Sequence, residues 1–313
     1  MYDFNLNTYI SLLEKIGKQG FSFTTFTDFI DKPQDKKVVL RHDVDTRKEN
    51  SLQFAKIQYK MGIVGTYNFR IFPQSFDEKV IEEIARLGHE IGYHYEDVSL
   101  TAERQKTKVK RQKWENDEDY ERFLAANAIE SFTENLERFR KIVPVKTICM
   151  HGSPLSRWDS RLLWKYYDYK DFGIVGEPYF DVNFDEVLYL TDTGRRWDGG
   201  VVSIRDKGLG IRNKGLGEEG YKGWKVKPVS GSLMNMTHES IDFQNKYKFR
   251  STSEIMLAAE KGELPDKIMM TFHPQRWTNK SVAWVRDLVW QNVKNVGKYF
   301  LVKLRNQELG IRD

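Results

Sequence analysis

The sequence predicts an α/β fold in which parallel strands alternate with helices. Short apolar runs alternate with amphipathic stretches along most of the chain. Glycine and proline separate these runs, as they do between regular elements. This alternation and its spacing are typical of βα units, which assemble either into a barrel or into a doubly wound sheet.

The amino-terminal half shows the alternation most clearly. Its predicted elements are a strand at 37–41, a helix at 47–61, a strand at 64–71, a helix at 76–87 and a strand at 89–94. Gly62 and Pro73 bound the second of these strands. Gly88 is a typical signal for the end of the second helix.

The pattern continues to the end of the chain. A polar stretch at 101–119 predicts a solvated helix or loop, with a mobile lid as the alternative. The remaining predictions are a helix at 120–142, strands at 146–150, 172–176, 187–191, 201–205 and 267–272, a glycine-rich excursion at 203–232, a helix at 279–296 and a strand at 299–304. We expect residues 1–313 to form a single domain.

Composition excludes several classes of protein. Fifty Lys and Arg against 45 Asp and Glu give a net charge of +5 without a compact basic arm, so we expect no nucleic-acid partner. Cys149 is the single cysteine, which rules out an intrachain disulfide. No secretory signal and no transmembrane segment are evident, and a cytoplasmic protein is expected. The sequence does not indicate the oligomeric state.

The histidines point to a site. Four of the six, namely His42, His94, His151 and His273, lie at or just beyond the carboxyl end of a predicted strand. In parallel α/β folds, the loops that bind ligands converge on that edge. We therefore place a candidate active site there.

The segment from Arg41 to Asp45 carries charge at the first of these strand ends. If the strand continues, Arg41, Asp43 and Asp45 share one face and His42 points to the other. Two carboxylates on one face repel each other unless a cation or a proton lies between them. The alternative is that the aspartates cap the following helix.

Further candidates follow the later strands. His94 and Glu96 share a strand face, and an imidazole with carboxylates is an ordinary ligand set for zinc. His273 precedes a proline and suits proton delivery to a leaving amine. At this edge, Trp197 and Tyr95 are candidates for binding substrate. Arg195 and Arg196 are candidates for orienting a carboxylate base.

These motifs, in this order over about residues 37–275, resemble the polysaccharide deacetylases of carbohydrate esterase family 4. The resemblance implies a distorted (β/α) barrel of about seven parallel strands, with the site at the strand carboxyl ends. It also implies Asp43 as the base, Asp45 and His94 as metal ligands and His273 as the catalytic acid. Gly88 to Gly92 matches the Gly-His-Glu-Ile-Gly run that precedes the family's first metal histidine.

The sequence departs from the family at three points. A valine separates Asp43 from Asp45, which are adjacent in the family, and Val98 occupies the position of the second metal histidine. Glu96, Asp97 and His151 are the candidates to complete the metal shell, and His151 or Glu96 is favoured. The arginine-proline motif is absent, so Arg195 or Arg196 is expected to orient Asp43.

The expected function is removal of an N-acyl group, first of all acetyl, from a sugar or glycan precursor. The expected cofactor is a divalent metal, with zinc as the first candidate. Two alternatives stay open. Val98 raises the possibility of a glycan-binding protein without catalytic activity, and a related C–N hydrolase would act on a small amide.

Overall fold

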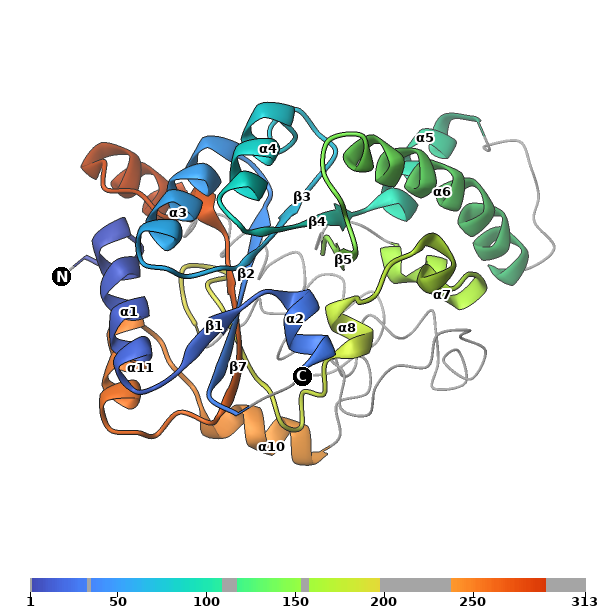
Figure 1. Cartoon of the computed structure of the whole chain (residues 1–313). Helices are drawn as coiled ribbons and strands as arrows, with labels where there is room; N and C mark the ends of the chain where they lie inside the picture. The colour runs from blue at the N-terminus through green and yellow to red at the C-terminus, as the bar shows by residue number, and fades with distance from the viewer. Residues whose placement is uncertain (1, 33–34, 109–116, 153–157, 198–237, 291–313) are drawn as a thin grey trace.

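Seven parallel strands form the centre of the molecule in a computed structural model that describes residues 2–32, 35–108, 117–152, 158–197 and 238–290 (Figure 1). The strands are β1 (Ser22–Thr24), β2 (Lys37–Val44), β3 (Thr66–Phe69), β4 (Glu90–Tyr95), β5 (Thr147–Met150), β6 (Leu188–Thr191) and β7 (Lys267–Phe272). All the pairings between them are parallel.

Six strands follow one path across the sheet, in the order β5-β4-β3-β2-β7-β6. The seventh, β1, pairs with the first half of β2, and β3 pairs with the second half. The sheet therefore forms a parallel half-barrel, which confirms the predicted α/β class. Closure into a complete seven-stranded barrel is not shown, because the path ends at β5 and β6 among the described residues.

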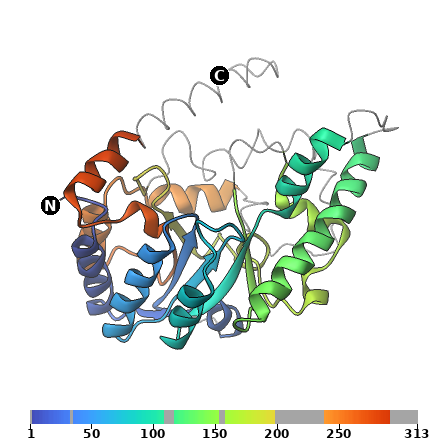
Figure 2. The same ribbon diagram turned by 90° about the horizontal axis from the view of Figure 1, so that it is seen from above.

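Helices pack around this curved sheet (Figure 2). They are α1 (Leu6–Lys18), α2 (Phe26–Asp31), α3 (Lys48–Lys60), α4 (Glu78–Arg86), α5 (Asp97–Lys108), α6 (Asp117–Arg140), α7 (Leu163–Tyr166), α8 (Pro178–Asp181), α10 (His238–Lys246), α11 (Thr252–Glu260) and a helix at 281–290. Of these, α1, α2, α7, α8, α10 and α11 were not among the predicted elements. The Asn5 side chain caps α1 by accepting from the Thr8 backbone N–H at 2.9 Å.

Side chains that alternate along each strand point to opposite faces of the sheet. His42 points toward the helices, where its ring stacks on Tyr67 with 4.1 Å between centroids. Its Nδ1 lies 3.0 Å from the Thr66 carbonyl oxygen, and burial lowers its pKa to about 3. Arg41 and Asp43 point the opposite way, into the curved interior. The sheet therefore has an apolar outer face and a polar inner face.

One predicted strand is wrong, and three predictions cannot be compared. Residues 169–172 form a 3₁₀ turn capped by the Asp168 side chain, and Gly173 follows with a φ of 69°. Within the predicted strand at 172–176, only Gly176 forms a bridge, with Thr147. The predicted strands at 201–205 and 299–304 and the glycine-rich excursion at 203–232 lie outside the described residues, as does the end of the 279–296 helix.

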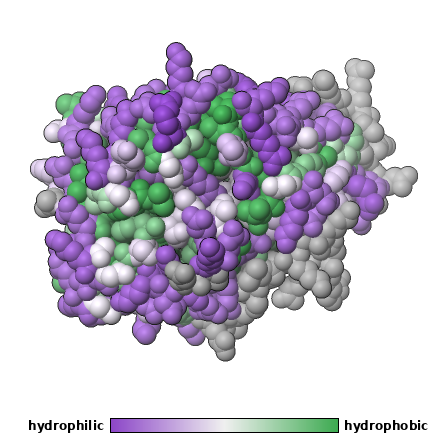
Figure 3. Space-filling model, viewed as in Figure 1, coloured by the Kyte–Doolittle hydropathy of each residue, from purple (hydrophilic) through white to green (hydrophobic). Residues whose placement is uncertain are grey.

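The surface is mostly hydrophilic on the face shown in Figure 3, with apolar areas between polar side chains. In the parts of the chain that the structure describes, no helix combines the length and the apolar character that a membrane crossing requires.

Candidate metal centre and catalytic residues

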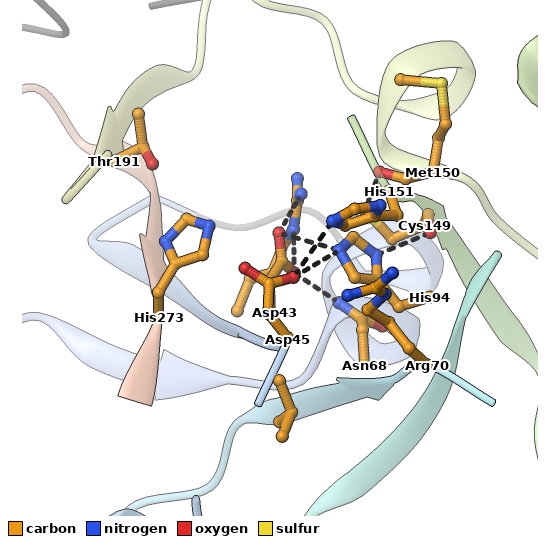
Figure 4. A network of polar contacts seen from close by, with 12 residues as sticks. Asp43, Asp45, Asn68, Arg70, His94, Cys149, Met150, His151, Thr191 and His273 are labelled. Carbon is orange, nitrogen blue, oxygen red and sulfur yellow. Dashed lines mark hydrogen bonds and ion pairs between the residues drawn. The ribbon is translucent and has the colours of Figure 1, made fainter. Parts of the chain in front are cut away.

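The carboxyl ends of four strands bring the predicted aspartates and histidines together (Figure 4). Asp43 and Asp45 lie at the end of β2 in the centre of the site. His94 from β4 and His151 beyond β5 lie on one side of them, and His273 beyond β7 lies on the other. Residues far apart in the sequence thus converge on the edge of the sheet where parallel folds bind ligands.

Asp43 is a buried carboxylate held by two side chains of the inner sheet face. Arg41 donates from Nε to Oδ1 at 2.9 Å and from Nη2 to Oδ2 at 2.6 Å, and Asn68 donates to Oδ1 at 3.1 Å. Burial by itself would raise the pKa of Asp43, but the charge and hydrogen bonds of Arg41, together with the nearby histidines His94 and His273, outweigh it and hold that pKa far below its usual range. The carboxylate is therefore ionised, with its Oδ2 directed toward His94 Nε2 at 3.9 Å.

Gly92 makes room for the amide that holds Asp43. It pairs with Asn68 across β3 and β4, and a Cβ at position 92 would lie 2.1 Å from Asn68 Oδ1. We expect Gly92→Ala to lower the free energy of unfolding in urea by about 1–3 kcal/mol, because Asn68 must move.

The matched control for this change is Gly17→Ala in α1. Its Cβ would meet only the Phe23 ring, at an ordinary 3.7 Å. This control is expected to be neutral, or stabilising by up to about 1 kcal/mol through helix propensity. Equal stability of Gly92→Ala and the unmodified protein would contradict the packing described for Asn68.

Three further side chains surround a point beside Asp43. Asp45 Oδ1 lies 3.7 Å from His94 Nε2 and 3.4 Å from His151 Nε2. One ligand atom from each of these residues falls within 4.8 Å of the others. The second oxygen of Asp45, Oδ2, accepts from Gln275 Nε2 at 2.9 Å, which leaves Oδ1 facing the two imidazoles.

The neighbours of the two imidazoles indicate which nitrogen carries the proton. His94 Nδ1 lies 2.9 Å from the Cys149 carbonyl oxygen, and His151 Nδ1 lies 3.1 Å from Glu96 Oε2. The Cys149 carbonyl accepts from His94, so that proton lies on Nδ1 and the lone pair on Nε2. His151 Nδ1 has no partner with hydrogen-bond geometry among the described residues, but its closeness to the Glu96 carboxylate favours the same tautomer. Burial lowers the pKa of His94 to about 4, and nearby carboxylates offset only part of that effect, so the ring is neutral at pH 7.

A divalent metal fits this donor set. Asp45 Oδ1 is buried and has no hydrogen-bond donor among the described residues. It faces two imidazole lone pairs, so three electron-rich atoms converge with no proton between them. A buried acceptor without a donor is costly, and a cation would remove that cost. Two imidazoles and one carboxylate are a common zinc ligand set with an open fourth position.

A second cluster, formed by Asp43, His94 and Cys149, has the spacing of a metal site but not its chemistry. Three donors already occupy the Asp43 carboxylate. Burial raises the pKa of the Cys149 thiol well above its usual range, so a thiolate is not available. The Asp45 cluster is therefore the better candidate for a metal site.

His273 is oriented by a carboxylate that does not figure among the predicted site residues. Asp192, fully buried just beyond β6, accepts from the His273 backbone N–H at 2.9 Å and lies 2.5 Å from its Nδ1. Trp277 Nε1 donates at 2.7 Å to Asp192 Oδ2, the oxygen that also accepts from the His273 backbone. With Nδ1 so occupied, Nε2 is the nitrogen left to exchange a proton on the side of the ring that faces the aspartates.

Two predicted roles need correction. Arg195 and Arg196 were expected to orient Asp43, but Arg41 does so, because residues two apart on a strand share a face. The Arg195 guanidinium instead lies over the rings of Phe4 and Trp284, and Arg196 is exposed at the surface.

The prediction that two aromatic residues, Trp197 and Tyr95, contact the substrate is also wrong. Trp197 is fully buried and donates from Nε1 to Thr252 at 2.9 Å. Tyr95 is fully buried as well, since its position next to His94 turns it to the opposite face of β4, against Trp164. Neither ring can stack on a sugar without leaving the core.

Val98, where the resemblance would place a second metal histidine, packs in the core at the start of α5. The positions of His151 and Glu96, the two favoured candidates for the third ligand, distinguish their roles. His151 joins the Asp45 cluster, whereas Glu96 contacts the far nitrogen of His151. Burial would raise the pKa of Glu96, but its contacts with His151 and Arg70 lower it to about 2.

Comparisons with known proteins add no family to this description. No family model matches the chain, and no curated protein matches it. A solved structure of diaminopropionate ammonia lyase from Escherichia coli, in its apo form, is 13% identical over 83% of this chain and 71% of that chain. Its TM-score of 0.16 is too low for this similarity to support any conclusion about fold or function.

Proposed function

We propose that this protein is a metal-dependent deacylase that hydrolyses the N-acyl group of a sugar or glycan precursor. The observation that carries the proposal is the convergence of Asp45 Oδ1, His94 Nε2 and His151 Nε2 beside an ionised Asp43. The motifs of the polysaccharide deacetylases lead to the same residues, with His151 in place of the family's second histidine.

The metal would be held by Asp45, His94 and His151, with zinc as the first candidate. A divalent ion in such a site supplies Lewis acidity, which polarises an acyl carbonyl and lowers the pKa of water. The ligand residues are already oriented for metal binding by their hydrogen-bond partners. Gln275 leaves one Asp45 oxygen free, and the Cys149 carbonyl turns the His94 lone pair inward.

Asp43 is the proposed general base. Its Oδ2 is directed toward the cluster, while Arg41 and Asn68 fix the carboxylate plane. It would accept the proton of the attacking water, a step for which position matters as much as pKa. Arg41 stabilises the ionised form in which Asp43 can accept that proton.

His273 is the proposed general acid for the departing amine. Its Nε2 would donate the proton while Asp192 holds Nδ1 and stabilises the charged ring. His273 lies across the aspartates from His94 and His151, so the acid would approach a bound substrate from the side opposite the two imidazoles (Figure 4).

The variant Asp192→Asn tests whether Asp192 supports His273 as the general acid or has only a structural role. We expect kcat to fall by roughly 100-fold, with KM and metal content unchanged, because an amide neither fixes the His273 tautomer nor stabilises its charge. Steady-state kinetics and elemental analysis measure these quantities. Asp266→Asn, an exposed change before β7, is the control and should leave kcat unaltered. A normal kcat in Asp192→Asn would remove the pair from the mechanism.

The substrate class is tested by measuring carboxylate release from N-acetylated sugars, nucleotide-linked N-acetyl sugars and small amides. The proposal expects metal-dependent acetate release from at least one sugar substrate. Release from small amides alone would assign the site to a different C–N hydrolase. No release from any substrate by metal-loaded protein would contradict a deacylase.

A further inference from the structure

Glu96 and Arg70 form a buried ion pair at the rim of the candidate metal site. Glu96 follows β4 and lies two residues beyond His94, on the same face of the strand. Arg70 follows β3, and its Nη2 donates to Glu96 Oε2 at 2.8 Å while its Nε donates to Oε1. The Glu96 side chain is only 8% exposed.

The sheet register explains why this pair meets His151. His94 lies opposite Cys149, and Tyr95 lies opposite Met150. The His151 backbone N–H continues the ladder by donating to the Tyr95 carbonyl at 2.9 Å. Glu96 and His151 therefore come next along the two strands, with Glu96 Oε2 lying 3.1 Å from His151 Nδ1.

We propose that Glu96 is a positioning residue, held by Arg70, that fixes the ring of His151 with its Nε2 lone pair directed at the metal. This inference rests on the proposed function and deepens it, because it assigns distinct roles to the two candidates for the third ligand. Glu96 acts through His151 and does not bind the metal.

The geometry disfavours Glu96 as a ligand. Arg70 donates to both of its oxygens, and His151 Nδ1 lies beside the second. The contact to His151 is made on the nitrogen opposite Nε2, which faces Asp45 at 3.4 Å. Carboxylates that hold the far nitrogen of a ligating histidine raise its basicity and fix its tautomer, and their loss costs about 10- to 100-fold in metal affinity.

Zinc titration of the full-length protein tests the proposal, with zinc dissociation constants obtained by competition with a chromophoric chelator. The variants are Glu96→Ala, His151→Ala and the double variant, and Glu96→Gln serves if the alanine variant does not fold. Glu103→Ala, an exposed change on α5, is the control for loss of a carboxylate near the site.

We expect Glu96→Ala to weaken zinc binding by about 10- to 100-fold, and Glu96→Gln by less because an amide oxygen can still accept from Nδ1. In the His151→Ala background, loss of Glu96 should have no further effect. Independent losses that multiply in the double variant would make Glu96 a ligand in its own right and overturn the proposal. Unchanged affinity in Glu96→Ala would overturn it too.

Imidazole ¹H–¹⁵N spectra of the metal-free protein separate this inference from the proposed function. They should show His151 protonated at Nδ1 in the unmodified protein and a mixture of tautomers in Glu96→Ala. If the unmodified protein binds no zinc but shows this tautomer change, the proposed function fails while the positioning role stands. An unaltered tautomer in Glu96→Ala would refute the positioning role, whatever the protein binds.

Discussion

Asp43→Asn is expected to lower kcat by about 10²- to 10⁴-fold, the range that general-base catalysis contributes. Asparagine keeps the size of the side chain but cannot accept a proton from water at neutral pH. It should leave the metal in place, because all three proposed ligands come from other residues. Acetate-release kinetics and elemental analysis of the same preparation measure both quantities.

The variant also alters the environment of Arg41, because an amide replaces the charged partner of a buried guanidinium. Urea unfolding must therefore accompany the kinetics, since breaking a buried ion pair costs about 3–5 kcal/mol. Asp45→Asn is the matched comparison on the same strand face, and it should lose metal. Loss of metal from folded Asp43→Asn would contradict its assignment as the base.

His94→Ala is expected to remove the metal. Its Nε2 faces Asp45 Oδ1 within the cluster, and the Cys149 carbonyl holds its ring in place through Nδ1. Loss of a direct ligand should weaken zinc binding by more than the roughly 100-fold upper range for an outer partner. Chelator competition measures the dissociation constant, and turnover should fall in parallel.

His89→Ala provides the control from the other end of the same strand. His89 lies before β4, where its Nε2 is 3.0 Å from the Ala55 carbonyl oxygen. Removing this buried ring should reduce stability and leave zinc stoichiometry unchanged. Equal zinc affinity in His94→Ala and the unmodified protein would exclude His94 from the site.

The central strands could be predicted from the sequence because their signals are local. The buried apolar runs that became β2, β4 and β7 stand between glycine, proline and polar segments. The pairing of β2 with β7 could not be predicted, because it joins segments over 200 residues apart. The missed helix α1 did carry a signal, since Asn5 precedes an apolar repeat that includes Tyr9, Leu12 and Ile16.

In the candidate site, the strand period was the reliable guide. It correctly placed Arg41 and Asp43 on one face and His42 on the other. The same rule was enough to predict the Arg41–Asp43 pair, although the role of orienting Asp43 was predicted for Arg195 or Arg196. Asp192 could have been suspected because it follows an apolar strand, as the histidines do.

The choice between His151 and Glu96 depended on information that a single sequence does not hold. It required the register of β4 against β5, which places the two side chains next to each other. Gln275 escaped notice for a similar reason, since its contact with Asp45 joins the end of β2 to the turn after β7. Contacts between strand ends arise from tertiary packing and have no local signature.

Metal stoichiometry of the purified, unmodified protein tests the central claim most directly. After reconstitution with zinc and removal of the excess, elemental analysis should find one zinc per chain, and none in a protein that lacks both His94 and His151. A folded protein that retains no zinc, manganese, cobalt or nickel after the same treatment would contradict the metal centre and the deacylase built on it.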